Sequence, residues 1–127
     1  MTALNEHEIA RRVPVWTALA ELFLDVELQD YQHQYIADTL RQSGYSLEEL
    51  QNIFSQEVAP VFHANLRTIA GEWQPWSADF VKERVLAYLG KRPTLAERFL
   101  PPDWLRSRQT APVQKRWEAV QNLFLAE

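Results

Sequence analysis

Residues 44–62 read GYSLEELQNIFSQEVAPVF and contain a clear signal for the start of a helix. Ser46 and Glu49 have the spacing of a capping box, in which each side chain satisfies a backbone N–H group at the helix start. Pro60 removes a backbone donor and should bend the helix, which we expect to resume as far as Ile69. The apolar residues at helical spacing, which we expect to face inward, are Leu47, Leu50, Ile53, Phe54, Val58 and Val61.

Upstream of this stretch, the spacing predicts a first helix over about residues 5–25. Asn5 and Glu8 are spaced as another capping box. Pro14 lies inside the apolar pattern and predicts either a kink or a second helix that starts there. The inward stripe consists of Ile9, Val13, Trp16, Ala20 and Phe23.

A second helix is predicted over about residues 31–43, with Asp30 as its cap. Gly44 follows this segment and suits the left-handed backbone position just after a helix. The residues that we expect this helix to bury are Tyr31, Tyr35, Ile36 and Leu40.

Downstream, Ser77 should cap a helix over about residues 78–89, with Gly90 at its end. A short helix capped by Thr94 and Glu97 should follow. The last helix should open at Thr110 and Pro112. The expected inward residues of the first and last of these helices are Phe80, Val81, Val85, Tyr88, Val113, Trp117, Val120, Leu123 and Phe124.

Strand signals are absent from the sequence, which has no alternating apolar run and no Asn-Gly or Asp-Gly hairpin. We therefore predict an all-α protein, a compact bundle of five or six helices with proline kinks. Its 127 residues fit a single helical domain over 1–127.

No catalytic or cofactor motif is recognisable. The chain has no cysteine, which excludes disulfide scaffolds, zinc ribbons and cysteine nucleophiles. It also lacks a glycine-rich phosphate loop and a two-histidine zinc helix. His7, His33 and His63 are far apart in the sequence, and we expect them at helix surfaces rather than around a metal ion. We expect no cofactor, no metal, no membrane span and no signal peptide, which makes a cytoplasmic location the default.

Charge is distributed unevenly along the chain. Residues 21–66 hold eight acids and one base, whereas residues 82–116 hold nine bases and three acids. The first half could therefore meet a basic partner, although the two halves could equally face each other or simply be solvated. The acids that we expect to carry such a surface are Glu21, Asp25, Glu27, Asp30 and Asp38. The sequence pI of about 5.4 argues against nucleic-acid binding.

Two charged residues fall on inward helix faces. Projected at 100° per residue, Glu57 lies between Ile53 and Val61, and Arg84 lies between Phe80 and Tyr88. Because an unpaired buried charge is costly, we predict a structural Glu57–Arg84 ion pair.

The segment Trp73-Gln74-Pro75-Trp76 is a second candidate site. Tryptophan is enriched at interface hot spots, and proline would limit the entropy lost on binding. Alternatively, the indoles of Trp73 and Trp76 fold back onto the core, which we favour for one of them. Trp104 beside a double proline has the same two possibilities.

Three stretches resemble a family of short, all-helical bacterial proteins of unknown function. They are ARRVPVWTALAELFLDVEL at 10–28, GYSLEELQNIFSQEVAPVF at 44–62 and AGEWQPW at 70–76. The resemblance implies a small helical protein of bacterial origin, without assigned catalytic residues.

The leading functional hypothesis is a non-enzymatic protein-binding module. Within that class we favour an immunity-type inhibitor, whose acidic surface would cover a basic bacterial toxin. The alternative is a structural or regulatory adaptor that forms a homodimer through the Trp73–Trp76 region. A third hypothesis is a small enzyme that uses Glu57 with His63, Asn65 or Arg84.

Overall fold

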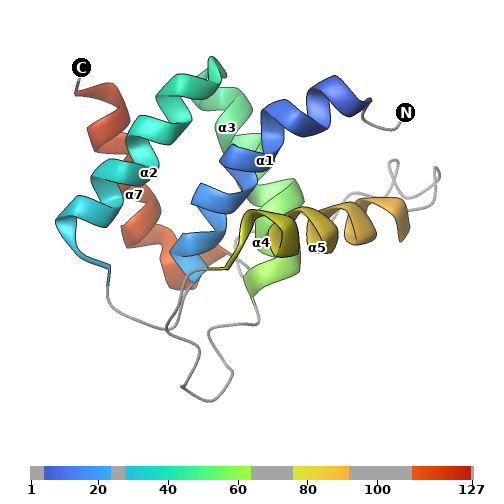
Figure 1. The fold of residues 1–127 in the computed structure, drawn as a ribbon. Coiled ribbons are helices and arrows are strands. Elements are labelled where there is room, and N and C mark those ends of the chain that lie inside the picture. Colours follow the sequence, from blue (N-terminus) through green and yellow to red (C-terminus); the bar gives the residue numbers. More distant parts are fainter. Residues whose placement is uncertain (1–4, 24–27, 64–75, 92–109, 127) are drawn as a thin grey trace.

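The structure, a computed structural model, describes residues 5–23, 28–63, 76–91 and 110–126, which are coloured in Figure 1. All regular elements within these ranges are helical, which confirms the prediction of an all-α protein. None of the helices in the described ranges has the length and apolar character needed to cross a membrane.

Helix α1 spans Glu6–Ala20 and continues into a 3₁₀ turn over Glu21–Phe23. Pro14 lies inside α1 without dividing it, so a second helix does not start there. Proline cannot donate to the carbonyl of Ala10, but both residues are exposed, and water can replace the missing donor. The inward stripe is confirmed for Trp16, Ala20 and Phe23, and Ile9 and Val13 pack at the margin of the core.

Helix α2 spans Asp30–Ser43 and ends at Gly44, whose φ of 80° confirms the predicted left-handed position. The predicted cap was wrong by one residue. The cap is Gln29, whose backbone N–H donates to the Gln32 side chain at 2.7 Å, and Asp30 is already the first residue of the helix.

Helix α3 spans Leu47–Ile53 and starts with the predicted capping box. The Ser46 hydroxyl accepts from the Glu49 backbone N–H at 3.1 Å, and the Glu49 carboxylate accepts from the Ser46 N–H at 2.8 Å. The backbone bond to Ser46 also lowers the pKa of the Glu49 carboxyl. The first turn of this helix was thus predictable from local chemistry alone.

A π-helical turn, Phe54–Val58, joins α3 to α4, Ala59–Phe62. The Ala59 N–H donates to the carbonyl of Phe54, five residues earlier, which is the π pattern. Pro60 follows directly. In a regular α-helix its ring would meet the carbonyl one turn before it, and the wider turn makes room for it.

Helix α5 spans Ala78–Lys91, and Ser77 caps it as predicted by accepting from the Phe80 N–H at 3.1 Å. We predicted that Gly90 ends this helix, but it lies within it, one residue before Lys91. A Cβ added at Gly90 would meet nothing within 4 Å, so neither space nor backbone conformation requires glycine there.

The last helix, α7, spans Gln114–Leu125 and follows a 3₁₀ turn over Ala111–Val113. Its predicted inward residues are buried or packed against the core. The predicted short helix at Thr94 and Glu97, and Trp104, lie outside the described residues.

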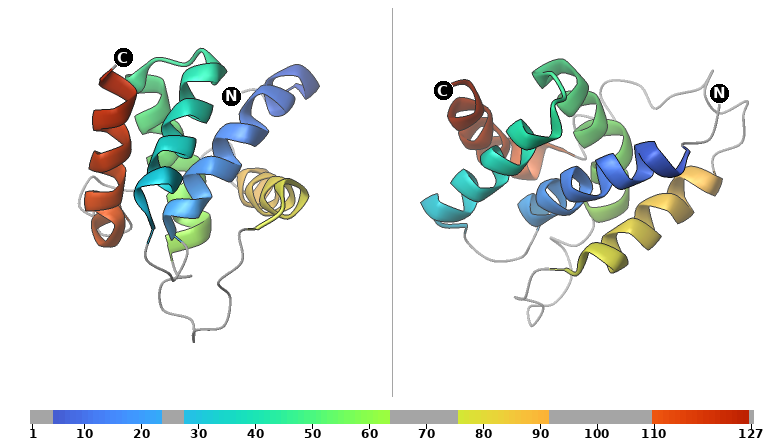
Figure 2. Two further views of the ribbon diagram at one scale, coloured as in Figure 1. Left: turned by 60° about the vertical axis from the view of Figure 1, so that its left-hand side comes forward. Right: turned by 45° about the horizontal axis from the view of Figure 1, so that its top comes forward.

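Figures 1 and 2 show α1 crossing the middle of the molecule, with α2 and α7 side by side on one flank and α5 on the other. An aromatic stack lies at the centre of the core. Phe54 packs between Phe23 and Trp117, with ring centroids 5.8 and 4.8 Å away. The Trp117 indole also donates to the Gln51 side chain at 2.6 Å, so its one polar atom is satisfied.

Two arginines attach the last helix to the first half of the chain. Arg41 on α2 donates to the carbonyls of Leu123 and Phe124 at the end of α7. Arg116 on α7 donates to the carbonyl of Leu22 at 2.9 Å. Cations stabilise a helix C-terminus, where backbone carbonyls lack partners, so Arg41 acts as a cap supplied by a neighbouring helix.

Candidate functional site

Glu57, in the π turn, faces α1 and not α5. Its carboxylate accepts hydrogen bonds from the Arg12 guanidinium and, at 2.7 Å, from the indole N–H of Trp16. The predicted Glu57–Arg84 ion pair was therefore wrong. Arg84 is exposed on α5, with its guanidinium 5.7 Å from the centre of the Phe80 ring. The projection assumed a regular α-helix, and a π turn advances each side chain by a smaller angle.

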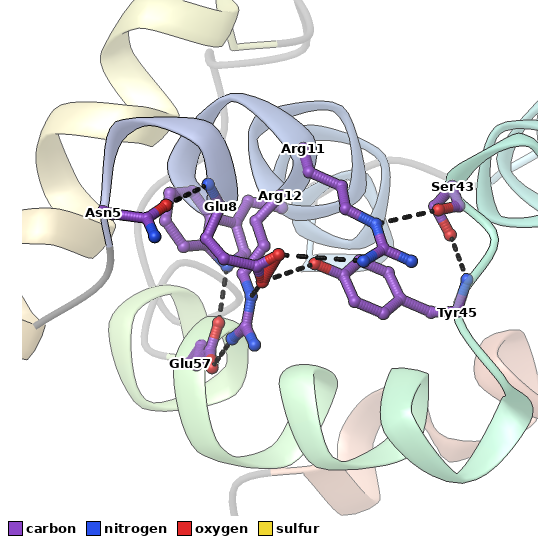
Figure 3. A network of polar contacts seen from close by, with 8 residues as sticks. Asn5, Glu8, Arg11, Arg12, Ser43, Tyr45 and Glu57 are labelled. Carbon is purple, nitrogen blue, oxygen red and sulfur yellow. Dashed lines mark hydrogen bonds and ion pairs between the residues drawn. The ribbon is translucent and has the colours of Figure 1, made fainter. Parts of the chain in front are cut away.

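A polar cluster extends from Glu57 along α1 to the start of α3, as Figure 3 shows. The Nε of Arg12 lies 3.6 Å from the Glu8 carboxylate, which also accepts from the hydroxyl of Tyr45 at 3.3 Å. The Arg11 guanidinium lies 4.0 Å from the centre of the Tyr45 ring and donates to the carbonyl of Ser43 at 3.2 Å. The cluster thus joins α1 to the turn between α2 and α3.

The same contacts fix the charges of the cluster. Burial alone would lower the pKa of Arg12, but the Glu57 carboxylate and the Tyr45 side chain together outweigh burial and raise this pKa. Burial raises the pKa of the Tyr45 phenol, although the neighbouring Arg12 opposes the shift. Arg12 therefore stays charged, and Tyr45 stays neutral, at physiological pH.

This arrangement favours a structural clamp over a reactive centre. Both oxygens of Glu57 already accept hydrogen bonds, so the carboxylate has little freedom to take a proton from a bound molecule. His63 ends α4 half-buried and has a partner of its own, while Asn65 lies outside the described residues. The Arg84 of the enzyme hypothesis is not paired with Glu57.

The acids predicted to form a partner surface have different surroundings. Asp30 is exposed at the start of α2. Asp38 accepts from Arg41 at 3.1 Å and from Gln34 at 2.9 Å, both on the same helix. Glu21 is half-buried after α1. Asp25 and Glu27 lie outside the described residues, so their places in this surface stay a prediction.

Glu21 should make stability depend on pH. Burial raises the pKa of its carboxyl in the folded state, so folding loses stability as pH rises through that pKa. Glu21→Gln should therefore raise the melting temperature at pH 7 and leave it unchanged below about pH 3, where the carboxyl is protonated in both states. Melting curves by circular dichroism from pH 3 to 8 measure this. Glu48→Gln, at an exposed position of α3, is the control; an equal gain from both variants would contradict the assignment to burial.

Trp76 is partly buried and packs against the core. Its ring lies 4.8 Å from that of Phe62 and 6.4 Å from that of Phe80. Trp73 lies outside the described residues. Of the two interpretations offered for this segment, the packing of Trp76 favours the one in which an indole covers the core.

Two tyrosines that we predicted to be buried are instead the most exposed aromatic side chains of the described residues. Tyr31 is 73% exposed and Tyr35 is 58% exposed. The buried face of α2 is formed by Ile36, Ala37 and Leu40, on the opposite side of the helix. At 100° per residue the two tyrosines are only one turn apart on the outer face, so a helical projection of α2 could have found them.

Metal ligands do not gather within the described ranges, where no group of three or more histidine, aspartate or glutamate side chains could hold an ion. His7 is exposed on α1, and His33 is half-buried on α2.

Comparison with known proteins places the chain in a family without giving it a function. The model of a domain of unknown function, DUF7079, matches residues 10–123. The chain belongs to this family. The predicted resemblance to a family of unknown function is thereby confirmed. Neither a curated protein nor a solved structure matches the chain.

Proposed function

We propose that this DUF7079 protein is a protein-binding module and that the outer face of α2 is its binding surface. The observation that carries this proposal is the exposure of Tyr31 and Tyr35, one turn apart on one helix. Tyrosine offers a large contact area and a hydroxyl at a low cost in side-chain entropy, and it is enriched in binding hot spots.

The charges beside the tyrosines favour a basic partner. Asp30 is exposed next to Tyr31, Asp38 lies one turn after Tyr35, and the net charge of the chain is −4. Within the class of binding modules we favour an immunity-type inhibitor, which would cover a cationic surface of a toxin. The polar cluster around Glu57 would serve this function indirectly, because it joins α1 to the turn that follows α2 and so helps to hold α2 in place.

A photocrosslinking amino acid placed at position 35 tests the proposal. We expect it to capture one basic protein in cells, whereas the same group at Glu48, exposed on α3, should not capture it. With that partner purified, Tyr31→Ala together with Tyr35→Ala should weaken binding by roughly 30-fold or more, as loss of a hot spot does. Phe80→Ala, at an exposed aromatic residue of α5, should bind as the unchanged protein does.

Equal affinity of the tyrosine variant and the unchanged protein would contradict the proposal, as would equal capture from positions 35 and 48.

Reversal of charge at Asp30 should slow association with a basic partner, most strongly at low salt.

A homodimeric adaptor is the second candidate, because Phe80 is 40% exposed and packs on the partly buried Trp76. Such a patch could be covered by a second copy of the chain. Light scattering at several protein concentrations distinguishes the two candidates. A dimer that Phe80→Ala dissociates would favour the adaptor, and a monomer at all concentrations would exclude it.

A further inference from the structure

A groove between α4 and α5 is lined by residues from both helices. Its volume is about 480 Å³, within the range of pockets that hold small molecules. The described residues that line it are Pro60, Val61, Arg84, Ala87 and Tyr88. Its lining residues belong to α4 and α5, whereas the two tyrosines belong to α2, which lies on the opposite flank of the molecule from α5 (Figures 1 and 2).

The chemistry of the groove is asymmetric. Pro60, Val61 and Ala87 present aliphatic surface, and Tyr88 contributes an aromatic side chain. Arg84 is the only lining residue among those described that carries a formal charge. The exposed lining is more polar than apolar, so a ligand that fits it combines one negative charge for Arg84 with a small apolar part for the aliphatic side chains.

Arg84 is available for such a charge. It is exposed, and within the described ranges no carboxylate forms an ion pair with it. Its guanidinium lies instead near the Phe80 ring, a contact that leaves donors free for a ligand. Arginine also matches a carboxylate with two parallel hydrogen bonds.

We propose that this groove binds a small organic carboxylate, with the apolar body of the ligand against Pro60, Val61, Ala87 and Tyr88 and its carboxylate on Arg84. The site is separate from the proposed protein-binding face of α2 and does not depend on it. Because the groove is open and the ligand small, the dissociation constant is expected on the order of 1 mM.

The test is a titration of the full chain with 4-phenylbutyrate and with its neutral amide, followed by NMR chemical shifts of backbone amides. We expect saturable shifts on α4 and α5 with the carboxylate, and roughly tenfold weaker binding of the amide. Arg84→Gln should remove that preference. Lys82→Gln, at an exposed cation of α5 outside the groove lining, should retain it.

A substitution that fills the groove gives an independent check. Ala87→Trp, at an exposed position of α5, should block the carboxylate and the amide alike while the circular dichroism spectrum stays helical. Absence of saturable shifts with 4-phenylbutyrate would overturn the proposal. So would equal binding of acid and amide, or binding that both Arg84→Gln and Ala87→Trp leave unchanged.

Discussion

Trp117→Ala should lower the free energy of unfolding by about 3–5 kcal/mol, the usual cost of removing a large aromatic side chain from a core. Trp117 is 1% exposed, stacks on Phe54 and donates to Gln51. The substitution would leave a cavity between α7 and the π turn and would separate α7 from the aromatic stack. Because small proteins are stable by only about 5–15 kcal/mol, the variant should lose a large part of the stability of the fold.

Urea unfolding followed by circular dichroism measures this loss, with Trp117→Phe as the matched control. Phenylalanine keeps the stacking on Phe54 but loses the hydrogen bond to Gln51, so it should cost clearly less than alanine. If Trp117→Ala cost under about 1 kcal/mol, the described packing of α7 against the π turn would be wrong.

Glu57→Ala should lower the free energy of unfolding by about 2–3 kcal/mol. The substitution leaves the half-buried Arg12 without its main counter-charge and the indole N–H of the buried Trp16 without its acceptor. Breaking a fully buried pair costs about 3–5 kcal/mol, but these two side chains remain 20% and 16% exposed, so water weakens the effect.

A double-mutant cycle separates the ion pair from the other effects of the substitution. Arg12→Met combined with Glu57→Leu should be more stable than the sum of the two single losses predicts, because neither charge is then left unpaired. Arg84→Met combined with Glu57→Leu is the control cycle, and it should be additive. Coupling of Glu57 to Arg84 rather than to Arg12 would contradict the structure.

Helix positions were predictable where short-range chemistry sets them. Ser46 with Glu49, Ser77 and Gly44 each act on backbone groups within a few residues, and each was confirmed. Apolar spacing likewise identified the buried stripe of α7. The prediction that Gly90 ends α5 was wrong because glycine is common just after a helix but can also lie inside one.

The exposure of Tyr31 and Tyr35 was predictable from a helical projection of α2, which places them opposite Ile36 and Leu40, but the prediction followed the general rule that aromatic residues are buried. Features that depend on the packing of distant helices were not predictable. Glu57 was correctly expected to need a charged partner. That this partner is Arg12 and not Arg84 depends on a π turn that no local sequence motif predicts. The error was one of helix geometry and not of electrostatics.

The π turn also sets a limit on changes of chain length in this protein. Such a turn holds one residue more than the regular helix that it interrupts. Deletion of a single residue there, such as Ser55, would let the segment close as an uninterrupted α-helix, because about five residues of a π turn cover the same angle as four residues of an α-helix. Leu50 and Ile53 of α3 would then keep their orientation relative to Phe62 of α4. The cost would fall on Pro60, whose ring would lose the room that the wider turn provides. An added residue has no such compensation and would rotate α3 by about 100° relative to α4, so the segment should accept a one-residue deletion more readily than a one-residue insertion.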